Sequence, residues 1–371
     1  MNIPFLSFNY MHGLLRDEAI KMFTQFYDDQ YYVLGKGTAK FEEEYAIFNH
    51  TKYCVGVSNG LDAIYIALKI LGVGNGDEVI VPSNTYIATA LAVTYTGATP
   101  IFAEPDESTY NISVKNIKAA ITASTKAIIP VHLYGQACEM DGIMRLAAEY
   151  GLFVVEDNAQ AHGAVYNGKI AGSFGHINAV SFYPGKNLGA LGDAGAVTTD
   201  NENYALHAAM MRNYGSKEKY YNESIGFNKR IDELQARFLS LKLKHLQAFT
   251  DERVQIAAWY NDALKNVPGI VTPYIAPGAS HVYHLYVIKT PYRDALSQYL
   301  KNQGIGTLIH YPIPPHLQKA YHHLGHKQND FPIAEQLAET CLSLPLYPGL
   351  QHEQVLFVCD AIKAFHSSKV L

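Results

Sequence analysis

Short apolar segments alternate with segments of helical spacing between residues 54 and 200. The apolar segments that predict strands lie at residues 54–57, 78–82, 99–105, 126–132, 152–157, 178–183 and 194–199. In the stretches between them, apolar residues recur at helical spacing, for example at residues 61–71 and 139–151. Strands that alternate with helices form βαβ units, which build a largely parallel sheet covered on both faces. We therefore expect an α/β fold.

The pattern changes after residue 230. One long helix is predicted over residues 232–264, opened by a pair that resembles a capping box, Asp232 and Gln235. Strands at 283–289 and 305–310 and helices near 293–303 and 332–342 predict a smaller α+β region. The length of 371 residues suits two domains. We expect a large α/β domain at 1–240, with the N-terminal segment, and a linking helix with a small domain at 241–371.

Composition limits the classes of partner. The formal net charge is −5 and no Lys/Arg-rich block occurs, so a nucleic-acid partner is not expected. No signal peptide and no run of about 20 apolar residues is visible, and we expect a cytoplasmic protein without a membrane partner. The four cysteines form no CxxC pair, which predicts buried or incidental thiols and no zinc site.

Two charged residues stand at the ends of neighbouring predicted strands. Asp157 ends the strand at 152–157, and Lys186 lies in the glycine-rich turn after the strand at 178–183. Ligands bind beyond the carboxyl ends of the strands in an open parallel sheet. A lysine there can form a Schiff base with pyridoxal phosphate, and an acidic partner keeps the pyridine nitrogen protonated. Each residue taken alone has a simpler explanation: Lys186 as a solvated surface residue, and Asp157 as a helix cap.

A polar turn, Ser58–Asn59–Gly60, opens the helix predicted at 61–71. Free backbone N–H groups and the positive end of the helix dipole make such a turn a seat for a phosphate group. Capping of the helix by the Asn59 side chain is the simpler explanation of the same turn. The turn matches neither a dinucleotide-binding nor a Walker A pattern, which disfavours NAD and ATP.

Six segments in this order resemble the DegT/DnrJ/EryC1/StrS family of pyridoxal-phosphate-dependent sugar aminotransferases. They are VSNGLDAI, PSNTYIATALA, VHLYGQ, VVEDNAQAHGA, SFYPGKNLGALGDAGA and GFNKRIDELQAR. The resemblance covers nearly the whole chain. It implies fold type I, with a mostly parallel mixed sheet between helices in the large domain and a smaller α+β C-terminal domain. The stretch YPGKNLGALGDAGA resembles the branch that aminates C3 of nucleotide-linked 3-keto-6-deoxyhexoses.

The resemblance implies a role in cofactor binding for nine residues. Lys186 is expected to be the Schiff-base lysine and proton shuttle, and Asp157 the partner of the pyridine nitrogen. Gln160 is expected to bond the phenolic oxygen of the ring, and Tyr86 to stack on its face. The remaining residues are expected to hold the phosphate: Asn59, Gly60, Leu61 and Ser181, together with Asn228 of the partner subunit in a homodimer.

The resemblance also implies contacts to the sugar nucleotide, made by Tyr183, Lys219, His310 and Tyr311. Three of these residues have simpler explanations. Tyr183 could pack under its loop, His310 could be a satisfied core histidine, and Lys219 could be a solvated loop charge.

The reaction expected from the resemblance has two steps. L-Glutamate gives its amino group to the cofactor and leaves as 2-oxoglutarate, and a dTDP-linked 3-keto-6-deoxyhexose then takes the group. Lys186 is expected to move the proton in both steps. A 4-keto sugar nucleotide is the alternative substrate, and both glucose-like and galactose-like products fit these residues. Sugar dehydratases of the same fold carry histidine in place of the lysine, and a catalytically silent regulator would not need Lys186, Asp157 and Gln160.

Overall fold

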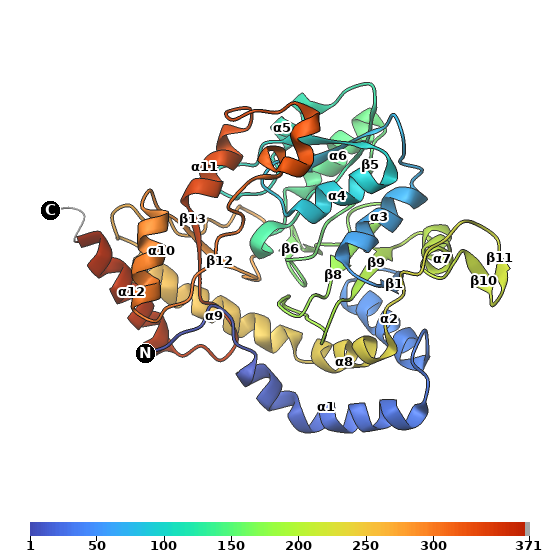
Figure 1. Ribbon diagram of the computed structural model, residues 1–371, viewed down its shortest axis with the longest axis horizontal. Coiled ribbons are helices and arrows are strands. Elements are labelled where there is room, and N and C mark those ends of the chain that lie inside the picture. Colours follow the sequence, from blue (N-terminus) through green and yellow to red (C-terminus); the bar gives the residue numbers. More distant parts are fainter. Residues whose placement is uncertain (368–371) are drawn as a thin grey trace.

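A computed structural model describes residues 1–367, and its α/β architecture confirms the predicted fold class (Figure 1). Four strands pair in parallel in the order β3-β2-β4-β5, and three pair antiparallel in the order β1-β9-β8. The strand bounds are β1 Tyr53–Val57, β2 Glu78–Pro82, β3 Thr99–Ala103, β4 Thr125–Ile128, β5 Phe153–Val154, β8 Asn178–Ser181 and β9 Gly195–Thr199.

Asp157 joins the two groups of strands. It pairs in parallel with Val131, which follows β4, and with Ala179 of β8. The Asp157 amide donates to the Pro130 carbonyl at 2.9 Å, and the Asn158 amide donates to the Ala179 carbonyl at 2.8 Å. The result is one mixed sheet, mostly parallel, with Asp157 at its centre.

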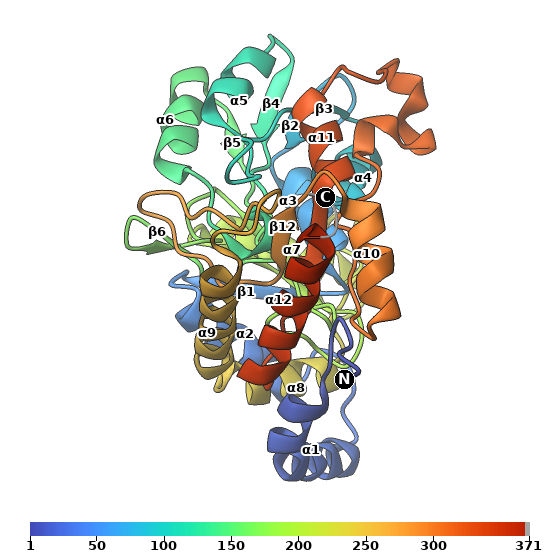
Figure 2. The same cartoon turned by 90° about the vertical axis from the view of Figure 1, so that its left-hand side faces the viewer.

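The pleat of β2 divides the core into two layers. Val79 and Val81 pack in the same cluster as α3 (Gly60–Ile70) and α4 (Ile87–Thr96). Ile80 points to the other face, toward α5 (Val114–Ala120) and α6 (Met140–Tyr150). Figure 2 shows α5 and α6 on one side of these strands and α4 on the other. Alternating side chains of a fully buried strand produce this arrangement.

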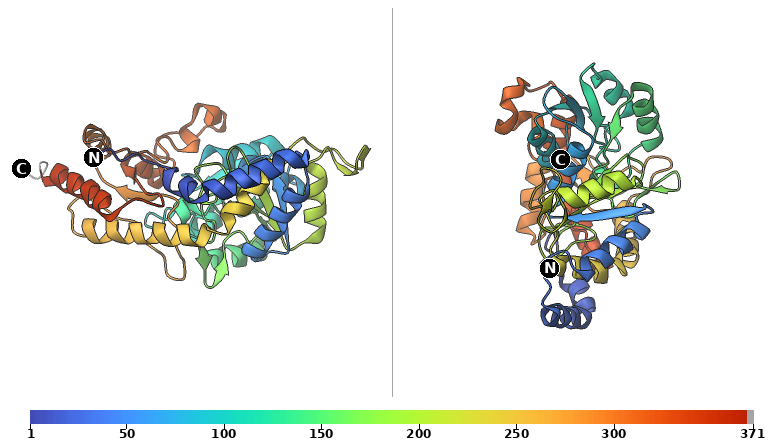
Figure 3. Two further views of the ribbon diagram at one scale, coloured as in Figure 1. Left: turned by 90° about the horizontal axis from the view of Figure 1, so that it is seen from below. Right: turned by 90° about the vertical axis from the view of Figure 1, so that its right-hand side faces the viewer.

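The C-terminal elements form a second core. The antiparallel pair β12 (Tyr286–Lys289) and β13 (Cys341–Leu344) packs with α9 (Leu246–Leu264), α10 (Arg293–Asn302) and α12 (His352–Ser367). Ile3 is completely buried in this core, so the first residues of the chain belong to it spatially. Figure 3 shows the N-terminus beside these elements. The domain boundary at residue 240 stays a proposal.

The remaining elements lie around the sheet. They are α1 Asn9–Asp29, α2 Lys36–Phe48, α7 Glu202–Met211, α8 Glu233–Leu243 and α11 Pro332–Thr340, the 3-10 turns Leu133–Gly135, Pro315–Leu317 and Lys319–Leu324, and the short hairpins β6–β7 (Val165–Tyr166, Lys169–Ile170) and β10–β11 (Ser216–Glu218, Tyr221–Asn222). The hairpin β10–β11 projects from the right-hand edge of Figure 1. Among residues 1–367, no helix is both long and apolar enough to cross a membrane. All four cysteines are buried free thiols, as predicted.

The single long helix predicted at 232–264 was wrong, because α8 ends at Leu243 and α9 begins at Leu246. The two helices serve different cores: Leu239 packs near α2, and Ile256 packs with α12. Between them the chain turns, and the His245 amide donates to the Lys242 carbonyl.

Two further predictions in this region were wrong. Asp232 makes no side-chain cap on α8, and the Gln235 carbonyl oxygen accepts from the Leu191 amide at 2.8 Å instead. Residues 305–310 form no strand and make only isolated bridges, Ile305 with Ile3 and Leu308 with Ser343. The chain is pressed against the N-terminal segment there, which interrupts a regular ladder.

Glu233 holds the start of α2 from outside that helix. Its carboxylate accepts hydrogen bonds from the amides of Gly35 at 2.9 Å, Gly37 at 2.6 Å and Thr38 at 3.0 Å. The Thr38 hydroxyl donates a further bond at 2.7 Å. Burial raises the pKa of Glu233, but these bonds outweigh it and hold the pKa below its usual range.

We predict that Glu233→Ala lowers the free energy of unfolding by about 3 kcal/mol, because three amides of the α2 turn lose their acceptor. Chemical denaturation at neutral pH measures this, with the exposed Glu43→Ala on α2 as the control that should change little. The stabilisation that Glu233 provides should be present above about pH 4.3, the pKa of a glutamate in the unfolded chain. It should be lost as the pH falls through the lower pKa that Glu233 has in the folded chain. Equal stability of the two variants would contradict this role.

Candidate active site

Lys186 lies in a tight turn between β8 and β9. The Lys186 amide donates to the Tyr183 carbonyl at 2.8 Å, and the Ala190 amide donates to the Phe182 carbonyl at 2.8 Å. A Cβ at Gly189 would lie 2.1 Å from the Pro184 carbonyl oxygen, so the turn closes only with glycine there. The turn presents the Lys186 side chain at the carboxyl end of β8, where it is partly buried.

The Lys186 ammonium is disfavoured by its surroundings. Burial lowers its pKa to about 8, although the charge of Asp157 raises it. Three histidines face the same region. Burial, followed by the charge of Lys186, lowers the pKa of His162 to about 3, that of His310 to about 4, and that of His284 as well. These imidazoles are therefore neutral, and a pKa of about 8 leaves roughly a tenth of the lysine uncharged at pH 7.

Asp157 is 7% exposed and its charge interacts with that of Lys186. One carboxylate oxygen accepts from the Thr89 hydroxyl at 2.9 Å, and the other accepts from the Ala159 amide at 3.2 Å. Burial raises the pKa of Asp157, and these two bonds and Lys186 only partly oppose it. A buried carboxylate with so little compensation favours a cationic ligand beside it.

Gln160 is held in one orientation. Its carbonyl oxygen accepts from the Tyr134 amide at 2.7 Å, so its NH₂ group must point the other way, where it donates to the Tyr311 hydroxyl at 3.1 Å. Tyr134 has a φ of 59°, which turns its amide toward Gln160. The Tyr86 ring lies 5.2 Å from the Tyr311 ring and is 53% exposed, so one face is open to a ligand.

The start of α3 is the turn that the sequence predicts to hold a phosphate. Asn59 caps the helix by accepting from the Asp62 amide at 2.8 Å, which confirms the simpler explanation. The amides of Gly60 and Leu61 find no acceptor among residues 1–367 and stay available to an anion. A Cβ at Gly60 would lie 2.6 Å from Cβ of Ser181, so only glycine lets α3 approach β8 this closely.

The residues predicted for the sugar nucleotide are dispersed. His310 and Tyr311 lie at the site, where the Nδ1 atom of His310 contacts the Ser343 hydroxyl at 2.8 Å. Tyr183 is 58% exposed beside the lysine turn, so it does not pack under its loop. Lys219 lies between β10 and β11 on the projecting hairpin, 5.2 Å from the ring centroid of Tyr220.

Asn228 is exposed and pairs with Asn213. Within the part of the chain that the structure describes, neither Asn228 nor Lys219 contacts Lys186 or Asp157.

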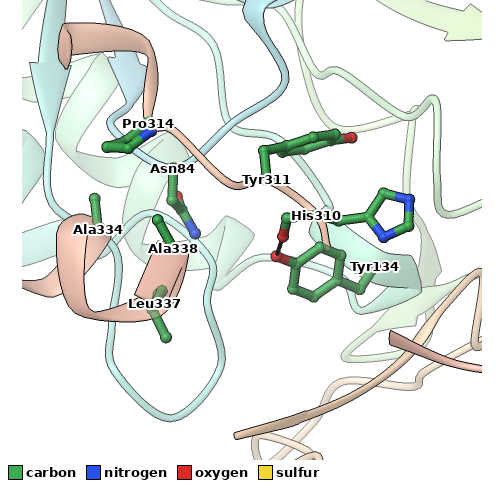
Figure 4. Close-up of a pocket in the computed structure, with 8 residues that line it drawn as sticks. All are labelled: Asn84, Tyr134, His310, Tyr311, Pro314, Ala334, Leu337 and Ala338. Carbon is green, nitrogen blue, oxygen red and sulfur yellow. Dashed lines mark hydrogen bonds between the residues drawn. The ribbon is translucent and has the colours of Figure 1, made fainter. Parts of the chain in front are cut away.

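Two hollows adjoin Tyr311. A narrow cavity of about 10 Å³ lies between the site and α11, with the Tyr134 hydroxyl donating to the His310 carbonyl at its edge (Figure 4). An open hollow of about 180 Å³ lies on the Tyr86 side and is lined by Thr85, Tyr86, Ile87, Tyr311, Pro312, Ile313, Pro315 and Gln318. Tyr311 lines both hollows.

Four residues at the site were not predicted individually: Thr89, Tyr134, His162 and His284. The first three lie in segments that carried the family resemblance, NTYIAT, VHLYGQ and AQAHGA. A threonine on a helix or a backbone amide gives no signal of its own, so only the fold reveals these contacts.

A lysine of lowered pKa, a buried aspartate that favours a cation and a helix start with free amides fit the needs of a pyridoxal-phosphate enzyme. The chain belongs to the DegT/DnrJ/EryC1/StrS aminotransferase family, whose profile matches residues 14–363. It is 47% identical over 363 residues to the dTDP-3-amino-3,6-dideoxy-alpha-D-galactopyranose transaminase of Aneurinibacillus thermoaerophilus, covering 98% of this chain and 99% of the relative.

Two further comparisons agree over the whole length. A Geobacillus stearothermophilus relative named pleiotropic regulatory protein is 43% identical over 368 residues, with 99% of each chain covered. The crystal structure of S. venezuelae DesV in complex with a ketimine intermediate matches with a TM-score of 0.97, at 44% identity and 98% coverage of each chain.

The predicted cofactor, pyridoxal phosphate, is confirmed at the level of the family. Bacillus subtilis NtdA, solved with bound cofactor PMP, matches with a TM-score of 0.89 at 30% identity, covering 98% of this chain and 85% of that one. The residues of this chain fit the group: Asp157 suits a cationic ring nitrogen, and the amides of Gly60 and Leu61 suit a phosphate. The chain is an aminotransferase.

We predict that Lys186→Ala keeps the fold but loses the visible absorption of covalently bound cofactor and at least 10²-fold in turnover, because no other tethered amine replaces it. Asp157→Asn should retain cofactor and lose about 10²–10³-fold, since an amide does not stabilise a cationic ring nitrogen. Absorption spectra and steady-state rates measure both, with the exposed Lys115→Ala as the unchanged control. Full activity of either site variant would contradict its assignment.

Proposed function

We propose that this aminotransferase moves the amino group of L-glutamate to the C3 keto group of a dTDP-linked 3-keto-6-deoxyhexose, which gives a dTDP-3-amino-3,6-dideoxyhexose. One observation carries the proposal: Lys186, whose pKa is lowered, and the buried Asp157 lie close together at one edge of the sheet. Similarity to a transaminase named for a dTDP-3-amino-3,6-dideoxy sugar supports the substrate. We also propose that the enzyme acts in the cytoplasm.

Each cofactor-binding residue has a distinct task in this proposal. Bound pyridoxal phosphate supplies the carbon that carries the amino group and a ring that withdraws electrons from the bond being broken. Asp157 would keep the ring nitrogen protonated, and the Gln160 NH₂ group, oriented by the Tyr134 amide, would bond the phenolic oxygen. Tyr86 would stack on the ring. The amides of Asn59, Gly60 and Leu61 and the Ser181 hydroxyl would hold the phosphate.

Lys186 moves the proton. With the cofactor bound, its Nζ would be the group that holds and moves the proton beside the carbon that bears the amino group, in each of the two steps. A pKa of about 8 supports this task, because both protonation states of the amine are accessible near neutral pH. The neutral imidazoles of His162, His284 and His310 add no positive charge beside it.

The substrate contacts are proposed for four residues. Tyr183 lies three residues before Lys186 and exposes its ring, which suits a bond to a hydroxyl beside the reacting carbon. His310 and Tyr311 close over the sugar from the C-terminal region. Lys219 meets the pyrophosphate as a mobile charge. Contacts remote from the reacting carbon orient it and can lower the barrier.

A homodimer with shared active sites accounts for the dispersed residues. Asn228 and Lys219 are exposed and lie away from Lys186 in the described chain, as expected if they serve a neighbouring site. Much of α1 is also exposed and apolar, including Leu14, Phe23 and Tyr27. We propose that the partner's Asn228 reaches the cofactor phosphate.

Two rival activities are disfavoured. A dehydratase of this fold would carry histidine where this chain has Lys186. A silent regulator, suggested by the name of the Geobacillus relative, would not need Lys186, Asp157 and Gln160 together. A 4-keto sugar nucleotide remains the alternative substrate, and the assay below decides between the two.

We predict that turnover with a dTDP-3-keto-6-deoxyhexose, generated in the assay from its 4-keto isomer by a ketoisomerase, exceeds turnover of the 4-keto sugar by at least tenfold, because the keto carbon must lie beside Lys186. Product analysis with and without the isomerase measures this. Lys219→Ala should raise KM for the sugar nucleotide more than it changes the glutamate half-reaction. Equal amination without the isomerase would overturn the C3 assignment and leave the aminotransferase class intact.

We predict complementation between two inactive variants. A mixed dimer of Lys186→Ala and Asn228→Ala chains has one site with both defects and one with neither. Random mixing makes half of the dimers hybrids, so activity should recover to roughly a quarter of wild type. Rates before and after subunit exchange measure this, with light scattering for the oligomeric state. No recovery despite exchange, or an active monomer, would overturn the shared site.

A further inference from the structure

Two buried hydroxyls form a chain that ends on Asp157. The Thr89 hydroxyl donates to the Asp157 carboxylate at 2.9 Å, and the hydroxyls of Thr85 and Thr89 lie 2.9 Å apart. Thr85 and Thr89 are each 1% exposed, and Asp157 is 7% exposed. Groups buried to this depth are shielded from bulk solvent, so each hydroxyl depends on its contacts within the protein.

The charge of Asp157 fixes the direction of this chain. An ionised carboxylate only accepts hydrogen bonds, so the Thr89 hydroxyl must donate its single proton to Asp157. The Thr89 oxygen can then only accept, which makes Thr85 the donor between the two threonines. Only protonation of Asp157 at the oxygen that faces Thr89 would allow both bonds to reverse. The two hydroxyls therefore stabilise the ionised form, and a charge-assisted bond of this kind is stronger than a neutral one.

The same turn carries the residue proposed to stack on the cofactor ring. Tyr86 follows Thr85 directly, and the Thr89 amide donates to the Tyr86 carbonyl at 3.2 Å. Thr85 and Thr89 thus tie the start of α4, with Tyr86 as its first flanking residue, to the carboxylate of Asp157. The hydroxyl chain fixes the ring-stacking side and the ring-nitrogen side of the site relative to each other.

We propose that Thr89, supported by Thr85, is a positioning residue that keeps Asp157 ionised and holds its carboxylate in the orientation required by the ring nitrogen of the cofactor. This inference rests on the proposed function, because it assigns Asp157 to that nitrogen. Burial raises the pKa of Asp157 and the Thr89 hydrogen bond lowers it, in agreement with this role. Thr89 itself touches neither substrate nor reacting atoms.

The test compares Thr89→Val, which keeps the shape and removes the hydroxyl, with Thr89→Ser, which keeps the hydroxyl. The first readout is the pKa of Asp157 in the full-length chain, measured by NMR with ¹³C-labelled aspartate and assigned with Asp157→Asn. Thr89→Val should raise this pKa, because the ionised form loses a hydrogen bond, and Thr89→Ser should restore it. The control is Thr94→Val, a matched change elsewhere in α4 and outside the site.

The second readout uses the chain loaded with pyridoxal phosphate. Thr89→Val should lower kcat about tenfold with little change in KM, and shift the acidic limb of the pH–rate profile upward, since a larger fraction of Asp157 is protonated. Thr89→Ser should recover most of the rate. Circular dichroism and thermal unfolding check that each variant is folded.

If Thr89→Val does not fold, Thr85→Val replaces it and should change both readouts in the same direction by a smaller factor, because the bond from Thr89 to Asp157 remains. An unchanged Asp157 pKa and pH profile in a folded valine variant, or no rescue by serine, would overturn the proposal. The NMR measurement needs no sugar substrate, so a failed substrate assignment would leave its result interpretable.

Discussion

The backbone pairing of Asp157 with Val131 on one side and Ala179 on the other joins the parallel and antiparallel parts of the sheet. This pairing fixes where the Asp157 carboxylate emerges and buries it at the carboxyl edge of the strands. A buried carboxylate requires a compensating charge, and the turn after β8 brings Lys186 to it. The register between residue 157 and β8 thus determines whether the two residues meet.

The charge balance of the site follows from the proximity of Asp157 and Lys186. Burial disfavours both the carboxylate of Asp157 and the ammonium of Lys186, and each charge favours the other. His162 and His310 lie close enough for the lysine to help keep them neutral. The site therefore holds one carboxylate and one titratable amine in surroundings of low polarity. A cofactor with a cationic ring nitrogen and an anionic phosphate complements it.

The sequence predicted what depends on local pattern. The strand at 78–82 and the helix start at Asn59 lie where apolar spacing and the polar turn placed them, because both signals act within a few residues. Asp157 and Lys186 were proposed for the same reason, at the ends of strands predicted to be consecutive, and the structure places the two charges near each other. The family resemblance added Gln160 and Tyr86, which no spacing rule identifies.

The errors lie where distant segments decide the structure. The helix break at Lys244 and His245 lies between α8, which packs with α2, and α9, whose later residues pack with α12. The acceptor for the α2 amides is Glu233, almost 200 residues away in sequence, so the start of that helix carries no local signal. Lys219 and Asn228 lie away from Lys186 in the described residues, and the shared site proposed for them would need a second copy of the chain, which one sequence does not describe.

One measurement tests most directly whether Asp157 and Lys186 form an amino-transfer site. The purified chain, loaded with pyridoxal phosphate, is mixed with L-glutamate in the absence of any sugar, and the absorption spectrum and the 2-oxoglutarate released are recorded. The account predicts that the visible band disappears while about one 2-oxoglutarate forms per chain, as expected for a single half-reaction. A band that persists, with no 2-oxoglutarate released, would contradict it.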